Sequence, residues 1–154
     1  MDTPIANNPI ITARIAALRG AMQRENIHAV LVPSSDPHIS EYLPDRWKSR
    51  EWLSNFTGSM GTLVVSANAA FLFADSRYWQ QAEVELSGTG ITLFKIKSGA
   101  SQEHVDWLAT NVGAGDTVAV DGAVLGLGAA RTLQYALEAR NISFRTDCDL
   151  LEAI

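Results

Sequence analysis

The segment TLVVSANAAFLFAD, residues 62–75, decides the fold class of this chain. Its two apolar runs, 62–67 and 69–75, are separated by Asn68 in a short turn, which is the sequence signal of a β-hairpin. The two strands of a hairpin pair antiparallel. In a chain that otherwise alternates helices and strands, this hairpin predicts an α/β fold with a mixed sheet.

Apolar spacing on both sides of the hairpin predicts the remaining elements. Asn8 and Pro9 form a helix cap and a first turn, and apolar residues recur at helical spacing from there to about Asn26. The other helices are predicted at 49–56, 76–86, 101–112 and 127–140. The other strands are predicted at 28–33, 91–97, 117–121 and 142–145, with the last at a sheet edge. The helix at 49–56 is expected to present Trp52, Leu53 and Phe56 to the core.

Composition indicates one ordered domain without an electrostatic signature for nucleic acid. The chain has 154 residues, of which 47% are hydrophobic and 19% charged, so a second independent core is not expected. The net charge is −5 and the lysines and arginines are scattered, which disfavours binding to a phosphate backbone. Nucleic acid is therefore excluded as an expected partner.

The single cysteine and the apolar pattern predict the cellular compartment of the protein and a domain boundary near residue 154. Cys148 has no second cysteine to pair with, which favours a reducing compartment. No basic segment leads into a long apolar run, and no apolar run reaches about 18 residues. We therefore expect a cytoplasmic protein with no membrane contact. The last residues, 147–154, begin an apolar pattern that is cut off, which resembles a truncation near a domain boundary.

The glycine-containing segment 58–61 raises the question of a phosphate-binding loop. Such a loop follows a strand and precedes a helix, so that the helix N-terminus points at the anion. Here the predicted order is reversed, because the segment follows a helix and enters a strand. We interpret Gly58 and Gly61 as residues that end the helix and turn the chain into the sheet.

The residues alone do not encode a recognisable active site. The histidines His28, His38 and His104 fall on separate elements without the spacing of a metal site, and no metal ligand set is predicted. His28 is interpreted as a strand-entry residue, and His104 as a solvent-exposed residue of a first helical turn. His38 lies in a loop rich in polar residues, where local capping and a functional role are both open.

Arg77 is the residue that most needs an explanation. It is predicted in the first turn of a helix that begins at Asp75 and Ser76, where the positive end of the helix dipole disfavours a cation. One explanation is a local ion pair with Asp75 or in the neighbourhood of Glu83. The other is that Arg77 reaches an anionic or carbonyl group supplied by another domain or subunit.

Four segments of the sequence, in this order and at this spacing, carry a family resemblance. They are SSDPHISEY (34–42), REWLSNFTGSMGTLVVS (50–66), AFLFADSRYWQQAEVEL (70–86) and TVAVDGAVL (117–125). Together they resemble the N-terminal domain of Xaa-Pro aminopeptidases (aminopeptidase P) in the larger, three-domain form related to creatinase and prolidase. The resemblance covers about residues 15–154. Met60 and Ser76 depart from it, since alanine and glycine are more usual there.

The resemblance implies a three-layer α/β/α domain with a mixed, mostly buried sheet. It also implies that residues 1–154 form one non-catalytic domain, while a C-terminal pita-bread domain absent from this chain holds two divalent metal ions, usually manganese. In that family the parent enzyme removes the residue that precedes proline, and the N-terminal domain helps to form the dimer and to wall the substrate cleft. The expected partners are the downstream domains, a second subunit and a proline-containing peptide. Arg77, His38 and Tyr78 are then substrate-cleft candidates.

Two alternatives stay open from the sequence. The chain can be a free-standing α/β module that binds a small molecule in a pocket at the carboxyl edge of its sheet, with Arg77 or His38 in that pocket. It can also belong to a creatinase-type enzyme with different chemistry in the part beyond this chain. In the favoured interpretation the isolated chain has no peptidase activity and carries no cofactor.

Overall fold

The computed structural model describes residues 8–32, 49–58, 61–97, 103–120 and 127–146. Helices and strands alternate along these ranges, interrupted by one hairpin, as the apolar pattern predicts. The helices are α1 (Pro9–Arg24), α2 (Ser49–Ser54), α3 (Trp79–Glu85), α4 (Glu103–Asn111) and α5 (Leu127–Glu138). The strands are β1 (Ala29–Val32), β2 (Thr62–Ser66), β3 (Ala70–Ala74), β4 (Thr92–Lys95), β5 (Thr117–Ala119) and β6 (Ser143–Arg145).

The strands form a six-stranded mixed sheet in the order β4-β3-β2-β1-β5-β6. Strand β2 pairs antiparallel with both β1 and β3, whereas β3 with β4, β1 with β5, and β5 with β6 pair parallel. Among the described strands, β2 therefore runs against all the others. The predicted hairpin is confirmed, and its turn closes with a hydrogen bond from Ser66 N to Ala69 O at 2.8 Å. The β6 strand lies at an edge, as expected.

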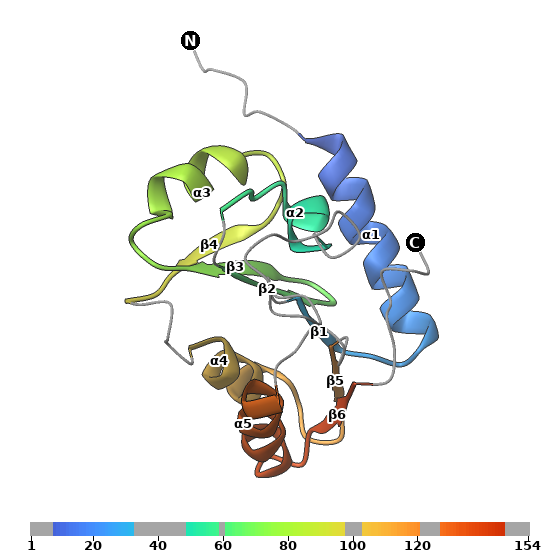
Figure 1. Cartoon of the computed structure of the whole chain (residues 1–154). Coiled ribbons are helices and arrows are strands. Elements are labelled where there is room, and N and C mark those ends of the chain that lie inside the picture. The colour runs from blue at the N-terminus through green and yellow to red at the C-terminus, as the bar shows by residue number, and fades with distance from the viewer. Residues whose placement is uncertain (1–7, 33–48, 59–60, 98–102, 121–126, 147–154) are drawn as a thin grey trace.

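Helices cover both faces of the sheet, which confirms the three-layer α/β/α arrangement. Helices α1, α2 and α3 lie on one face, and α4 and α5 on the other (Figure 1). Alternate residues of β1 divide between two buried clusters: Val30 and Val32 join the cluster that includes α1, and Leu31 joins the cluster that includes α4 and α5. Because a strand directs successive side chains to opposite faces, an unbroken apolar strand such as β1 fills both cores.

Helix α1 begins as its sequence predicts. The Asn8 side chain accepts a hydrogen bond from Ile11 N at 3.2 Å, and Pro9 occupies the first turn. This arrangement satisfies one amide that a helix start leaves without an intrahelical partner. The buried residues of α1 recur at the expected spacing and are Ile11, Ile15, Leu18, Ala21 and Met22.

Helix α2 corrects one expectation about the core. Leu53 and Phe56 are fully buried, but Trp52 is 40% exposed. Successive helical residues point about 100° apart, so the face that buries Leu53 turns Trp52 toward the surface. There the Arg14 guanidinium lies 4.3 Å from the Trp52 ring centre and donates a hydrogen bond to the Trp52 carbonyl at 2.8 Å.

Gly58 and Gly61, which lie between α2 and β2, both contact a buried arginine. Arg50 of α2 is 5% exposed and donates to the carbonyl oxygens of Gly58 and Gly61, the latter at 3.1 Å. The order helix, segment, strand is the reverse of a phosphate-binding loop. The described part of the segment therefore serves the entry of the chain into the sheet, as interpreted from the sequence. The expectation that its glycines end the helix is wrong, because α2 ends at Ser54 and Asn55 takes the left-handed conformation there, with φ 67°.

Candidate functional site

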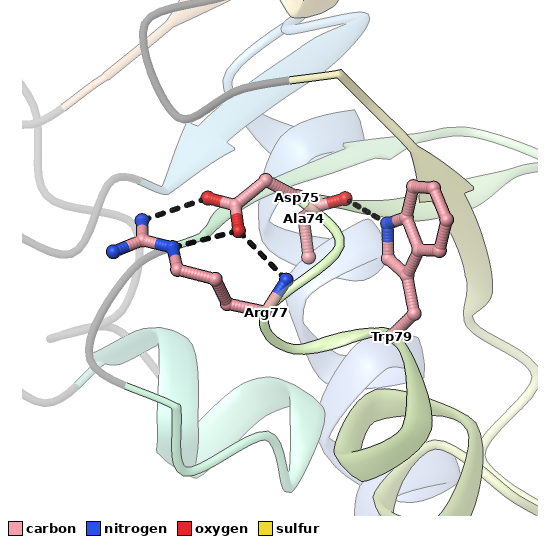
Figure 2. A network of polar contacts seen from close by, with 4 residues as sticks. All are labelled: Ala74, Asp75, Arg77 and Trp79. Carbon is pink, nitrogen blue, oxygen red and sulfur yellow. Dashed lines mark hydrogen bonds and ion pairs between the residues drawn. The ribbon is translucent and has the colours of Figure 1, made fainter.

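An aspartate and an arginine form a rigid turn directly after β3. The Asp75 Oδ1 atom accepts hydrogen bonds from Arg77 N at 3.0 Å and from Arg77 Nε at 2.9 Å, and Oδ2 accepts from a terminal guanidinium nitrogen at 2.9 Å (Figure 2). The Asp75 side chain is 5% exposed, whereas the Arg77 side chain is 64% exposed. The buried carboxylate thus holds one edge of an arginine whose remaining surface faces outward.

The position of Arg77 relative to the next helix differs from the prediction. Helix α3 begins at Trp79, so Arg77 precedes it and is not part of its first turn. The Asp75 carboxylate binds the Arg77 amide instead of capping α3, and Tyr78 N donates to the Asp75 carbonyl at 3.0 Å, which makes a turn. The dipole argument for Arg77 is therefore wrong, while its local pairing with Asp75 is confirmed.

Both partners are more firmly charged than the free side chains. Hydrogen bonds from the Arg77 side chain hold the pKa of Asp75 below its ordinary value of 3.8. The same contact with Asp75 raises the pKa of the Arg77 guanidinium. Trp79 adds a second constraint, because its Nε1 donates to the Ala74 carbonyl at 2.8 Å (Figure 2). Hydrogen bonds therefore fix the turn both at Asp75 itself and at the preceding residue, Ala74.

Tyr78 shares this turn, and the structure brings it next to Arg77. Its ring meets the Phe56 ring edge to face, with ring centres 6.0 Å apart, and the Arg77 guanidinium carbon lies 5.2 Å from the Tyr78 ring centre. Tyr78 is half-buried, and its contact with Phe56 joins the turn to the residues that follow α2. The third candidate, His38, lies outside the described residues.

Arg77 stands at the carboxyl edge of the sheet. Strands β1, β3, β4, β5 and β6 run in one direction, so they all end at the edge where Asp75 and Arg77 follow β3. Open α/β sheets bind ligands outside the carboxyl ends of their strands. An exposed guanidinium at this edge can donate two parallel hydrogen bonds to a carbonyl or carboxylate.

The two described histidines have structural partners. Thr117 N donates to His28 Nδ1 at 3.0 Å, which links the starts of β1 and β5 and agrees with the interpretation of His28 as a strand-entry residue. His104 packs against Phe73, with ring centres 6.1 Å apart, and burial lowers its pKa. The expectation that His104 is solvent-exposed is wrong, because α4 lies over the sheet at that point. Within the described ranges no three His, Cys, Asp or Glu residues cluster as metal ligands would.

Comparison with known proteins assigns the family. Residues 14–150 match the family described as the Creatinase/Prolidase N-terminal domain. The chain belongs to this family. Within the described residues, no helix has the length and apolar content needed to cross a bilayer.

Curated relatives of this family member are much longer proteins. The chain is 35% identical over 130 residues to Xaa-Pro aminopeptidase 2 of Homo sapiens, a match that covers 84% of this chain and 19% of the human protein. It is 39% identical over 125 residues to a probable Xaa-Pro aminopeptidase P of Talaromyces marneffei, covering 81% of this chain and 19% of that protein. The chain thus spans about a fifth of the length of these relatives.

Solved structures support the same assignment. The X-prolyl aminopeptidase of Caenorhabditis elegans, described as a cytosolic enzyme with a di-nuclear active site, superposes with a TM-score of 0.85 at 27% identity. That match covers 96% of this chain and 26% of the nematode chain. The N-terminal domain of the peptidase PepQ of Mycobacterium tuberculosis superposes with a TM-score of 0.67 at 24% identity over 92% of this chain and 98% of that chain. The second likeness supports the fold alone.

Stability should depend on acid pH through Asp75. Its pKa is lower in the folded chain than in the unfolded chain, so the unfolded state binds more protons between those two pKa values. The pair therefore stabilises the fold above about pH 4 and loses that effect as pH falls through the folded pKa. In Asp75→Asn the Tm should be lower than in the wild type near neutral pH, and the gap should close toward about pH 2.

Thermal unfolding followed by circular dichroism from about pH 6 to about pH 2 measures this gap. Asp106→Asn is the matched control, because it makes the same substitution at an exposed carboxylate of α4. A gap between wild type and Asp75→Asn that stays constant across the whole pH range would contradict the assigned role of the ion pair.

Proposed function

We propose that this chain is the N-terminal, non-catalytic domain of a metal-dependent Xaa-Pro aminopeptidase. The family match over residues 14–150 supports this proposal, together with relatives that carry the name Xaa-Pro aminopeptidase and are about five times longer than the matched part. In this proposal residues 1–154 form one domain, and the catalytic domain belongs to the part of the polypeptide beyond it. The parent protein removes an N-terminal residue that precedes proline.

The domain contributes one wall of the substrate cleft in this proposal. Arg77 supports that role, since it is exposed at the carboxyl edge while Asp75 fixes its Nε side. A side chain held in one orientation loses less conformational freedom when it binds. Its free edge suits a carbonyl or the terminal carboxylate of a peptide. Tyr78 borders the same turn, and His38 is proposed as a third cleft residue from the resemblance alone.

The metal chemistry belongs elsewhere in the polypeptide. Within the described ranges no cluster of three metal-ligating residues exists, so these residues do not fit a two-metal centre. The nematode relative is described with a di-nuclear active site. We therefore assign two divalent metal ions, manganese by the family resemblance, to the catalytic domain of the parent. Dimer formation through this domain and a cytoplasmic location complete the proposal.

A comparison of the chain with its full-length parent tests the proposal. The purified 154-residue chain and the full-length protein are incubated with an X-Pro peptide and Mn²⁺, and release of the first residue is measured. We expect turnover by the full-length protein and none by the chain alone. Turnover by the 154-residue chain alone would overturn the non-catalytic assignment, and a full-length protein that never cleaves X-Pro bonds would overturn the assignment of the parent. Sedimentation of the full-length protein tests the dimer.

A further inference from the structure

A hollow lies at the edge of the sheet opposite Arg77. It has a volume of about 460 Å³ and is bordered by the β2–β3 turn, the end of α4 and the starts of β1 and β5. This volume lies in the range of small-molecule sites, about 300–1,000 Å³. Because the parallel strands begin here and end at Arg77, the hollow is separate from the proposed substrate cleft.

One wall of this hollow is aromatic. Phe71 of β3 and Trp107 of α4 contribute to it, with ring centres 5.2 Å apart and planes inclined at 59°. Both side chains are half-buried, and Val112 adjoins them. This wall offers an apolar surface for a ligand body and π-faces that attract a cation.

Asp116 and Asn111 give the hollow hydrogen-bond acceptors. Because Thr117 N donates to His28 Nδ1, the neutral imidazole carries its proton on Nε2, and that atom lies 3.4 Å from Asp116 Oδ1. The Asn111 amide nitrogen donates to the Trp107 carbonyl at 2.9 Å. These donors are therefore used within the protein, while among the described residues no hydrogen bond reaches the second Asp116 oxygen or the Asn111 oxygen, which can act as acceptors.

Asp116 is placed to receive a positive charge. Its side chain is 39% exposed, and in the described ranges neither lysine nor arginine forms an ion pair with it. Gly113 makes room for the carboxylate, since a Cβ atom there would lie 3.0 Å from Asp116 Oδ2. A carboxylate beside aromatic rings selects an organic cation over an anion, and the net charge of −5 acts in the same direction.

We propose that this hollow binds a small organic ammonium ion. The charged end of the ligand meets Asp116 and the Asn111 oxygen, and its apolar body packs on Phe71 and Trp107. This site is independent of the proposed peptidase function, because its ligand would bind at the opposite edge of the sheet.

Titration of the 154-residue chain with 2-phenylethylammonium, followed by ¹H–¹⁵N NMR, tests the site. We expect saturable shifts confined to residues that border the hollow, including the Trp107 indole. The uncharged 2-phenylethanol and the anionic 3-phenylpropionate should bind at least about tenfold more weakly, because each lacks the ammonium charge. Equal binding of the alcohol, or no saturable shift up to about 10 mM amine, would overturn the proposal.

Three variants connect the binding to named residues. Asp116→Asn should weaken the amine at least about tenfold, whereas Asp106→Asn, the same change at an α4 carboxylate outside the hollow, should leave its Kd within about twofold. Asn111→Lys places a cation at an exposed position of the rim and should abolish amine binding without touching the core. If Asp116→Asn fails to fold, Asn111→Lys therefore still tests whether the hollow binds the amine. Unchanged amine affinity in Asn111→Lys, or an equal loss in Asp106→Asn, would contradict the proposal.

Discussion

Arg77→Ala in the full-length enzyme proposed above is expected to lower kcat/KM for an X-Pro peptide by about a hundredfold, or about 2.7 kcal/mol of transition-state stabilisation. The reason is the loss of a charge-assisted, two-pronged donor at the carboxyl edge of the sheet. Arg77→Lys keeps the charge but loses the planar fork, so it should retain an intermediate activity. Steady-state kinetics on one peptide series measures both variants.

Stability must be separated from catalysis in this experiment, because Arg77 also neutralises the buried Asp75. Asp75→Asn provides the matched comparison. It breaks the same ion pair, but the chain still carries the Arg77 guanidinium. We expect similar losses of Tm in Arg77→Ala and Asp75→Asn, together with a clearly larger loss of kcat/KM in Arg77→Ala. Arg131→Ala, at an exposed position of α5, should change neither quantity.

A purely structural Arg77 predicts a different outcome. In that case kcat/KM falls in proportion to Tm across the series, and Asp75→Asn impairs the enzyme as much as Arg77→Ala does. Such a result would remove Arg77 from the substrate cleft and leave it as the partner of a buried carboxylate.

The parts of the fold that sequence reasoning predicted depend on local patterns. The hairpin at 62–75 and helix α1 are encoded by apolar spacing, a turn and a cap that lie within a few residues of one another. The pairing of Arg77 with Asp75 could be anticipated for the same reason, because the two residues are neighbours in the chain.

The errors arise where a contact joins distant segments or where two local interactions compete. Trp52 is exposed because the helical face that buries Leu53 directs it outward, where Arg14 of α1 packs on its ring. His104 is half-buried because α4 packs over Phe73. The start of α3 was misplaced because the Asp75 carboxylate binds the Arg77 amide instead of capping the helix. A capping residue and a turn residue have the same identity in sequence, and only the surrounding contacts separate them.

The candidate sites also combine residues that the sequence indicates with positions that only the folded chain reveals. Arg77 could be named from the sequence, but its place at the carboxyl edge follows from the strand directions. The hollow at His28 and Asp116 was not predicted, because it exists only when β1 and β5 lie side by side. Arg50 carried no signal either, since its partners, the carbonyl oxygens of Gly58 and Gly61, lie 8 and 11 residues away in the chain.

Phe56→Ala should be among the most destabilising substitutions in this chain. Phe56 is fully buried between α2 and the Asp75–Arg77 turn, where it contacts Tyr78. Loss of a buried phenylalanine ring costs about 3–5 kcal/mol, which combines lost burial with the cavity that is left. Urea unfolding of the 154-residue chain measures the change in free energy. Tyr135→Ala, at a side chain that is 82% exposed on α5, should change it little.

Gly58→Ala tests the same packing by adding volume instead of removing it. A Cβ atom at residue 58 would lie 2.3 Å from the Phe56 ring and 2.9 Å from the Tyr78 ring, so the substitution overfills a closed space. We expect a loss of about 1–3 kcal/mol in the free energy of unfolding. Gly20→Ala is the control, because its Cβ would meet only the Arg24 side chain, at 3.6 Å. Within helix α1 that change should be neutral or stabilising, since alanine favours a helix over glycine.

The double variant Phe56→Ala/Gly58→Ala then shows whether glycine is required at 58 by the Phe56 ring or by its other close neighbour, Tyr78. If the ring is the reason, the Cβ at 58 enters space that the missing ring has left, and the double variant loses less stability than the sum of the single variants. The expected difference is about 1–2 kcal/mol. Strict additivity would mean that the Cβ at 58 clashes with the Tyr78 ring instead, and the Phe56 contact would then not explain why glycine occupies the entry to β2.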